Sequence, residues 1–442
     1  MSSVSDTSGP SSNSVPGDCA TGTSAAPHAG TASSPNQTVP NQTVPNPTVP
    51  NQTVPNQPHP DTMAITAGRK DNSAALAPIL WASTAFETPT LAEGRKMAKS
   101  TQATKFYSRY GNPTVRAFED AVAELEGAEA ARAFASGMGA ISAVVLGLVS
   151  SGQHIVAQKQ LYGGTYQLLT MVCPRFNIDV TFVDATKPGA FAEAIIPGRT
   201  MLIVAESPAN PCLDLVDLDE LGALIPITMV DSTFATPLGC NPLAHGVNLV
   251  MHSATKAMAG HNDASLGVIA GERELIDWLW GFAVLQGANA SPFDALNGLR
   301  GLRTLGVRLR QQSATALALA KALEANGVVT EVRYPGLPSH PQFALARRQL
   351  RSHGGLVTFD VGSAAVGERL VDALKLCRGA TSLGGPETLV THPVSTTHAG
   401  LDPDELAASG ITPGTIRVSA GLEYADDVIA DILGALKTSL AS

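Results

Sequence analysis

Beyond residue 60, the chain alternates short apolar runs with segments whose apolar residues have helical spacing. This alternation is the feature that most restricts the possible folds. Short buried strands separated by helices are typical of a mostly parallel sheet with helices on both faces, so we expect an α/β fold. The expected strands are 154–158, 179–184, 200–207, 227–231, 248–253 and 265–271, and the expected helices are 115–126, 141–149, 163–172 and 218–224.

A long helical stretch over residues 296–325 leads away from this predicted sheet. The chain beyond it mixes expected strands at 330–335, 355–361 and 415–421 with further helices, which indicates a smaller α/β domain at the C-terminus. We therefore predict an N-terminal arm and large domain over residues 63–310, followed by a small domain over residues 311–442.

Residues 1–62 have a different composition, rich in Ser, Thr, Pro, Asn and Gly. From Asn36 the chain repeats NQTVP, and the proline of each unit prevents a helix. One valine per unit cannot form a core, so we predict a disordered low-complexity tail. The alternative is a partner-binding or glycosylated stalk, because N-x-T triplets begin at Asn36, Asn41 and Asn51. The absence of a recognisable secretory signal disfavours it.

Composition restricts the class of partner. A net charge of −9 over 442 residues argues against nucleic-acid binding, which needs a basic surface. We find no apolar run near the roughly 20 residues that a spanning helix needs, so no membrane partner is expected. The cysteines are odd in number, widely spaced and without a C-x-x-C pair, which favours reduced thiols in a cytoplasmic protein and predicts no metal site. They are Cys19, Cys173, Cys212, Cys240 and Cys377.

The sequence HSATKAMAGHND at residues 252–263 places Lys256 just beyond an expected strand. A charged lysine is costly to bury, so Lys256 either reaches solvent or serves as an amine that has lost its proton. Polar residues also follow neighbouring expected strands, at Glu206, Asp231 and Ser253. In parallel sheets ligands bind beyond the carboxyl ends of the strands, so these side chains are candidates for one site.

The turn SGMGA at residues 136–140 lies between the segment AEAARAFAS (128–136), also expected to form a strand, and an apolar helix, where free backbone N–H groups bind phosphate. Pyridoxal phosphate (PLP) needs such an anchor, a lysine for its aldehyde and a carboxylate beside its ring nitrogen. Lys256 and Asp231 suit the last two needs, and Tyr162 could stack on the ring. Each feature alone has an ordinary explanation: a solvated lysine, a helix-capping Asp, a packed tyrosine. The combination favours PLP.

These residues are part of a longer pattern. Over nearly all of residues 63–442, the chain resembles the Cys/Met-metabolism (trans-sulfuration) family of PLP-dependent enzymes. The resemblance implies an aspartate-aminotransferase-like large domain, PLP fold type I, with a mostly parallel sheet. Besides the lysine segment, the motifs are YSRYGNPTV (107–115), SGMGA (136–140), LYGGTY (161–166), ESPANP (206–211), VDSTFATP (230–237), SLGGPETL (382–389) and IRVSAGLE (416–423).

The resemblance also implies roles for single residues. Lys256 binds the cofactor aldehyde and moves protons, and Tyr162 stacks on the ring and assists. The other cofactor-binding residues are Gly137, Met138, Asp231, Thr233, Ser253 and Thr255, together with Tyr107 and Arg109, which in this family reach the phosphate of the neighbouring subunit. Asn210, Ser382 and Arg417 bind the substrate. These roles imply amino-acid substrates and a homotetramer, a dimer of dimers with shared active sites.

The motifs narrow the choice of family member. Cystathionine β-lyases usually carry Trp where this chain has Leu383, and methionine γ-lyases usually carry Cys where it has Gly164. O-Acylhomoserine sulfhydrylases often show N-L-G-D in place of S-L-G-G, although HPVSTTH (392–398) is more familiar in sulfhydrylases and methionine γ-lyases. We favour a cystathionine γ-synthase. The alternatives are a γ-lyase acting on cystathionine or methionine, a sulfhydrylase, a non-catalytic protein that keeps the fold, and an aminotransferase or decarboxylase on the same fold.

Overall fold

The computed structural model describes residues 58–70 and 72–441 of the chain. In this described part, seven strands form the first sheet in the order β1-β7-β6-β5-β4-β2-β3. The strands from β3 to β6 in this order are parallel, and β7 is antiparallel to both of its neighbours. The bounds are β1 (Ala130–Phe134), β2 (His154–Gln158), β3 (Asp179–Val183), β4 (Thr200–Glu206), β5 (Ile227–Asp231), β6 (Leu249–His252) and β7 (Gly267–Gly271).

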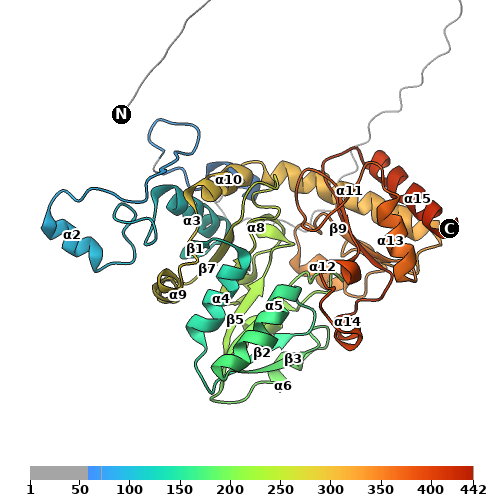
Figure 1. Ribbon diagram of the computed structural model, residues 1–442, viewed down its shortest axis with the longest axis horizontal. Helices are drawn as coiled ribbons and strands as arrows, with labels where there is room; N and C mark the ends of the chain where they lie inside the picture. Colours follow the sequence, from blue (N-terminus) through green and yellow to red (C-terminus); the bar gives the residue numbers. More distant parts are fainter. Residues whose placement is uncertain (1–57, 71, 442) are drawn as a thin grey trace, which may run out of the picture. The chain divides into compact units, whose positions relative to one another are not determined.

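Helices cover both faces of this sheet, as the alternating pattern predicts (Figure 1). On one face, α4 (Gly137–Leu148) and α9 (Arg273–Gln286) pack against strand residues in a core that includes Val144, Met229 and Ile269. On the other face, α3 (Pro113–Glu126) and α10 (Pro292–Leu302) enclose a second core around Phe118 and Val250. The mostly parallel α/β architecture of the prediction is confirmed.

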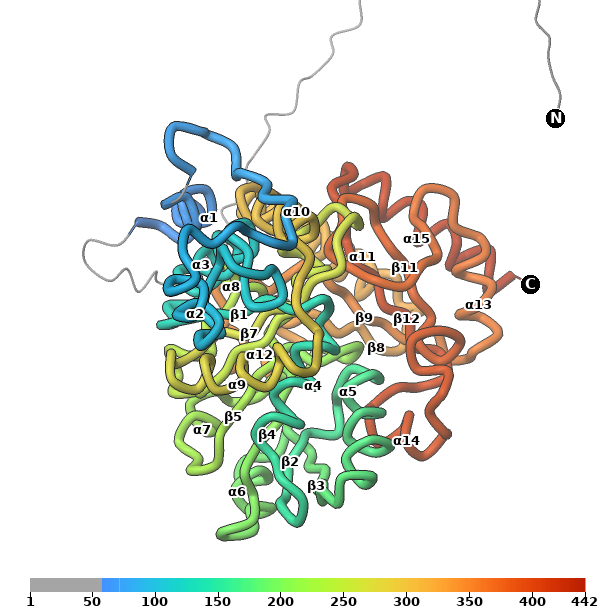
Figure 2. The backbone as a smooth tube through the Cα atoms, turned by 60° about the vertical axis from the view of Figure 1, so that its left-hand side comes forward, coloured from blue at the N-terminus to red at the C-terminus, as the bar shows by residue number. Residues whose placement is uncertain are grey.

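The second sheet has the order β10-β11-β12-β9-β8. Its core contains Phe359 and Ile416 from the sheet and is covered by α11 (Leu305–Asn326), α13 (Ala364–Asp372) and α15 (Ala425–Ala441). Figure 2 shows these elements grouped together, in orange and red. The strands are β8 (Glu331–Arg333), β9 (Leu356–Asp360), β10 (Arg378–Gly379), β11 (Leu389–Thr391) and β12 (Thr415–Ser419).

The helix α11 contributes to two cores, the Phe118 core against the first sheet and the core of the second sheet. Its first turns place Leu305 and Leu309 in the core against the first sheet, and its later turns place Leu319 and Leu323 in the core of the second sheet. The predicted domain boundary between residues 310 and 311 therefore lies inside a continuous helix, and the division into 63–310 and 311–442 stays a prediction.

One expected helix, over residues 296–325, is wrong as a single element. The chain forms α10 and α11 with a break between them, because Thr304 has φ −115° and ψ 3°, outside the helical region. The Thr304 side chain there accepts a hydrogen bond from Arg308 Nε at 3.1 Å. Gly301 and Gly306 flank this break, and glycine lowers helix propensity, so the sequence carries a local signal for it.

Most of the predicted tail, residues 1–57, lies outside the described residues. Residues 60–62, which we had assigned to the tail, begin the helix α1 instead, with proline in its first turn and the His59 side chain accepting from the backbone N–H of Asp61. In the described part, no helix is long and apolar enough to span a membrane. The other helical segments are α1 (Pro60–Thr66), α2 (Leu91–Ala98), α5 (Gly163–Gln167), η1 (Leu168–Val172), η2 (Cys173–Phe176), α6 (Ala190–Glu193), α7 (Leu218–Gly222), α8 (Thr236–Gly239), η3 (Pro242–His245), α12 (Phe343–Gln349), η4 (Pro393–Ser395) and α14 (Pro403–Ala408).

Candidate active site

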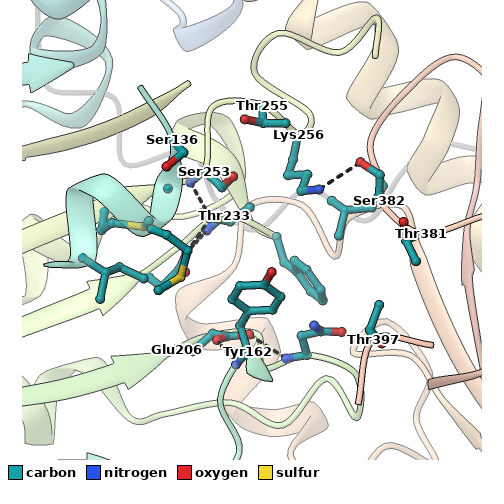
Figure 3. Close-up of a pocket in the computed structure, with 18 of the residues that line it drawn as sticks. Ser136, Tyr162, Glu206, Thr233, Ser253, Thr255, Lys256, Thr381, Ser382 and Thr397 are labelled. Atoms are coloured by element: carbon teal, nitrogen blue, oxygen red, sulfur yellow. Dashed lines mark hydrogen bonds between the residues drawn. The ribbon is translucent and has the colours of Figure 1, made fainter. Parts of the chain in front are cut away.

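A cavity of about 290 Å³ lies beyond the carboxyl ends of β4, β5 and β6, where the polar strand-end residues were expected to meet. Segments that follow the second sheet's β10 and η4 close it, so both sheets contribute to its wall (Figure 3). The predicted residues that line it are Gly137, Met138, Tyr162, Asn210, Asp231, Thr233, Ser253, Thr255, Lys256, Ser382 and Arg417.

Lys256 follows β6 and turns its amine into this cavity. Its Nζ lies 2.9 Å from Ser382 Oγ, in the segment after β10 (Figure 3). Burial and, secondarily, the charge of Arg417 lower the pKa of the Lys256 amine below its usual value. A lowered pKa raises the fraction of neutral amine, which is the form that attacks a carbonyl and accepts a proton.

The N-terminus of α4 forms a cradle for an anion. Ser136 precedes the helix and accepts a hydrogen bond from the backbone N–H of Gly139 at 3.0 Å. Gly137 passes so close to the segment that follows β6 that a Cβ on it would lie 2.9 Å from Ser253 Cβ. The hydroxyl of Ser253 and the free N–H groups of this first turn therefore converge on one small space, as phosphate binding requires.

Asp231 ends β5 and is buried at the base of the cavity. Thr233 donates to Asp231 Oδ1 from its backbone N–H, at 3.0 Å, and from its hydroxyl. Burial raises the pKa of the Asp231 carboxyl, and these two hydrogen bonds oppose the rise. Both bonds use Oδ1, so Oδ2 remains for a positively charged group in the cavity, which would also lower the pKa.

Tyr162 immediately precedes α5 and extends its ring into the cavity opposite Lys256 (Figure 3). Its backbone N–H donates to Glu206 Oε2 at 2.8 Å, and Glu206 Oε1 accepts from the backbone N–H of Asn210, also at 2.8 Å. Glu206 is buried at the end of β4, and burial together with nearby Asp231 raises the pKa of its carboxyl well above the usual value. The Glu206 carboxyl group therefore fixes the backbone at both Tyr162 and Asn210, two residues that line the cavity.

Arg417 lies in β12 and is 2 % exposed. Its Nη1 donates to Asn210 Oδ1 and its Nη2 to the carbonyl oxygen of Ser382, each at 2.8 Å. Burial lowers the pKa of the guanidinium to about 10, which leaves it charged at neutral pH, while Glu206 opposes the shift. A fixed guanidinium at the cavity wall suits the bidentate binding of a carboxylate.

Two predicted cofactor-binding residues do not line the cavity. Tyr107 is 45 % exposed, and Arg109 Nη1 donates to the carbonyl oxygen of Val284 at 3.2 Å. The prediction assigns both to the site of a neighbouring subunit, and the structure holds one chain, so their role stays a prediction.

The cavity also includes residues that the sequence did not predict. Met251 is the register partner of Asp231 in the β5–β6 pair, so strand alternation could have identified it. Phe234 lies inside a motif that we quoted without assigning it a role. Ile141 lies in α4, one helical turn after Gly137. For Thr381 and Thr397 the sequence carries no clear signal, because their loops reach the cavity only through the packing of the second sheet.

The arrangement fits PLP. The cradle at Gly137 and Ser253 matches the phosphate, the carboxylate of Asp231 matches a protonated ring nitrogen, and the low-pKa amine of Lys256 matches the aldehyde. A parallel α/β sheet with these groups at its carboxyl edge defines a PLP-dependent enzyme of fold type I. The chain belongs to the Cys/Met metabolism PLP-dependent enzyme family, whose model matches residues 61–437.

Relatives of known activity span the chemistry of this family. The chain is 40 % identical to an L-methionine gamma-lyase from Porphyromonas gingivalis, over 84 % of this chain and 95 % of the relative. It is also 40 % identical to an O-succinylhomoserine sulfhydrylase from Pseudomonas aeruginosa, over 84 % and 94 %. The protein is therefore a PLP-dependent enzyme of the trans-sulfuration type, acting at Cγ.

Solved structures support the same conclusion. A cystathionine gamma synthase from Xanthomonas oryzae, in complex with aminoacrylate and cysteine, has a TM-score of 0.81 and 34 % identity, covering 87 % of this chain and 99 % of that one. A putative O-acetylhomoserine (thiol)-lyase from Campylobacter jejuni has a TM-score of 0.81 and 27 % identity, covering 86 % and 100 %. The latter contains N'-pyridoxyl-lysine-5'-monophosphate, in which the cofactor is joined to a lysine.

Proposed function

We propose that the enzyme is a cystathionine γ-synthase, which joins an O-acylhomoserine to cysteine. The observation that carries this choice is the packing of Gly164. A Cβ at this position would lie 2.6 Å from Tyr162 Cε1 and 3.0 Å from Met138 Sδ. The tyrosine ring thus fills the space that a side chain at 164 would need, whereas methionine γ-lyases usually carry cysteine there. Leu383, 5 % exposed, stands where cystathionine β-lyases usually carry tryptophan.

The chain's own residues would hold the substrate. Arg417 would bind the α-carboxylate of the amino acid with two parallel hydrogen bonds, and Asn210 would fix the guanidinium for that purpose. Ser382 would support the same carboxylate. Gly137, Met138, Ser253 and Thr255 would hold the cofactor phosphate, while Thr233 would keep Asp231 facing the ring nitrogen.

Lys256 would carry the protons. The bound cofactor supplies an electron sink for the charge that remains when Cα loses its proton. Lys256, as a neutral amine, would accept the Cα proton and then take part in removing one from Cβ, with Tyr162 assisting. The acyl group would then leave Cγ as a carboxylate, and the cysteine thiol would lose its proton as its sulfur forms the new bond at Cγ. Lys256 would return a proton to Cβ and one to Cα.

Methionine γ-lyase is the second candidate, favoured by the 40 % identity to the enzyme from Porphyromonas gingivalis. In that reaction no thiol is added, and the substrate breaks down to 2-oxobutanoate, ammonia and a thiol. Elimination from cystathionine would follow the same course. An O-acylhomoserine sulfhydrylase is a third candidate, favoured by the equally similar enzyme from Pseudomonas aeruginosa.

We propose a homotetramer built from dimers with shared sites. The half-exposed ring of Tyr107 and the adjacent Arg109 lie outside the cavity of their own chain, as residues that complete a neighbour's site would. Mass measurement in solution tests this assembly. Mixing inactive Lys256→Ala chains with inactive Arg109→Ala chains tests sharing, because mixed dimers would regain one intact site.

The reaction is tested with the PLP-loaded enzyme and three reactant sets: O-succinylhomoserine with cysteine, cystathionine alone and methionine alone. Cystathionine formation exceeding 2-oxobutanoate release supports the synthase. Rapid release of 2-oxobutanoate from methionine or from cystathionine overturns it in favour of the corresponding γ-lyase. Lys256→Ala serves as the control, and it should lose turnover in every set.

A further inference from the structure

Arg308 is a buried cation that the proposed reaction does not use. It lies in the first turns of α11, is 4 % exposed, and burial lowers the pKa of its guanidinium to about 10. Among the residues that the structure describes, no carboxylate forms an ion pair with it. A buried charge without a counter-ion is costly unless its N–H groups are satisfied by other acceptors.

Two of the acceptors belong to the turn that follows Lys256. Arg308 Nη1 donates to the carbonyl oxygen of Ala257 at 2.7 Å, and Nη2 donates to that of Met258 at 3.3 Å. Nη2 also donates to the carbonyl oxygen of Gly301 at 2.7 Å. The guanidinium therefore binds the backbone immediately after the reactive lysine and ties it to the end of α10.

A glycine makes this approach possible. Gly260 has φ +69°, and a Cβ there would lie 2.0 Å from Arg308 Nη1. Its backbone N–H closes the turn by donating to the carbonyl oxygen of Lys256 at 2.8 Å. The backbone of residues 256–260, which we call the Lys256 turn, is held by this internal bond and by the bonds to Arg308. The backbone N–H groups of Lys256 and Ala259 also donate to the carbonyl oxygens of Ser253 and Ala254.

Gln312 lies one helical turn after Arg308 on the same face of α11 and is 2 % exposed. Its Nε2 donates to the carbonyl oxygen of Gly385 at 2.9 Å. Gly385 ends the Ser382 segment, residues 382–385. This segment also presses on the Lys256 turn, because a Cβ at Gly384 would lie 2.5 Å from the backbone nitrogen of Ala257.

We propose that Arg308 and Gln312 are positioning residues for proton transfer. They hold the Lys256 turn and the Ser382 segment at a fixed separation, and so keep Lys256 Nζ in contact with Ser382 Oγ. A displacement of about 1 Å in a reacting group can reduce the rate by about 100-fold, so loss of the contacts of Arg308 or Gln312 should slow proton transfer. The inference rests on proton transfer at Cα, which is common to the family's chemistry, and is independent of the thiol that the enzyme uses.

The variants for the test are Arg308→Lys, which keeps the charge but loses the planar set of donors, and Gln312→Met, which keeps the length and loses the donor. Arg351→Lys is the matched control. Arg351 also donates to backbone carbonyls, those of Leu238 at 3.2 Å and Pro237 at 2.6 Å, but it does not line the cavity. If Arg308→Lys does not fold, Gln312→Met decides alone.

Each PLP-loaded variant is assayed with the amino acid that the wild type turns over, carrying hydrogen or deuterium at Cα. We expect kcat to fall about 10- to 100-fold in Arg308→Lys and Gln312→Met. The deuterium isotope effect should rise in both, because a displaced Lys256 makes proton removal slower relative to the other steps. A purely structural defect reduces the active fraction and leaves the isotope effect unchanged. An unchanged isotope effect in both variants overturns the proposal.

A second measurement needs no turnover. The visible absorption of the lysine-bound cofactor changes with pH, and its midpoint depends on the surroundings of Lys256. We expect the midpoint to shift in Arg308→Lys and Gln312→Met and to stay at the wild-type value in Arg351→Lys. Equal midpoints in all four proteins would overturn the proposal, whichever substrate the enzyme proves to use.

Discussion

Replacement of Arg417 by lysine tests the substrate side of the site. The guanidinium donates to Asn210 Oδ1 and to the carbonyl oxygen of Ser382, and Arg417 also lines the cavity. Lysine provides a single charged nitrogen, so the substrate carboxylate would keep one charge-assisted hydrogen bond and lose the other. One such bond contributes about 1.5–3 kcal/mol, which corresponds to a fall of about 10- to 150-fold in kcat/KM.

The assay is the initial rate over a range of amino-acid concentrations, with the visible absorption of the bound cofactor recorded on the same sample. We expect that absorption to persist in Arg417→Lys, because Arg417 is not placed at the phosphate or the ring. Arg369→Lys is the control, since Arg369 in α13 donates to the carbonyl of Ser439 in α15 and does not line the cavity. A fall in kcat/KM no larger than that of the control would refute the proposed binding of the substrate carboxylate by Arg417.

Three further predictions follow from single contacts. Thr233→Val removes the hydroxyl that donates to Asp231, and such a hydrogen bond contributes about 1 kcal/mol. PLP should therefore bind about 5-fold more weakly in a titration of the apoenzyme. An unchanged affinity for PLP would contradict this. Gly164→Cys places a Cβ 2.6 Å from the Tyr162 ring and should displace it, lowering kcat/KM; full activity would show that the ring moves without cost. Burial lowers the pKa of His398 to about 4 from 6.5, so the unfolded chain binds this proton more readily than the folded one. Stability should therefore be complete above pH 6.5 and fall as the pH approaches 4, and His398→Gln should show a weaker fall in urea unfolding; equal slopes would refute this.

The sequence predicted the large sheet well because its signal is local. Each strand is a short apolar run, and the polar residue at its end marks the edge at which ligands bind. Glu206 and Asp231 are register partners in adjacent parallel strands, so correct strands alone bring them together. Lys256 and Ser253 follow the next strand, and the same reasoning places them nearby.

The remainder of the site depends on contacts that no local pattern encodes. Thr397 reaches the cavity from a loop of the second sheet, and Arg308 acts through carbonyl oxygens, which every residue possesses. The break at Thr304 is different, because Gly301 and Gly306 flank it and weaken the helix locally. The Thr304 hydroxyl also accepts from Arg308 Nε, which satisfies a buried donor at the break.

The shared helix α11 has a consequence for how the protein loses its structure. Its first turns pack in one core and its later turns in another, so neither core is complete without it. Melting α11 would expose apolar surface on both sides at once, and partial unfolding of one half should therefore be disfavoured. Calorimetry on the tail-free chain should record one cooperative heat-absorption peak in place of two separate transitions.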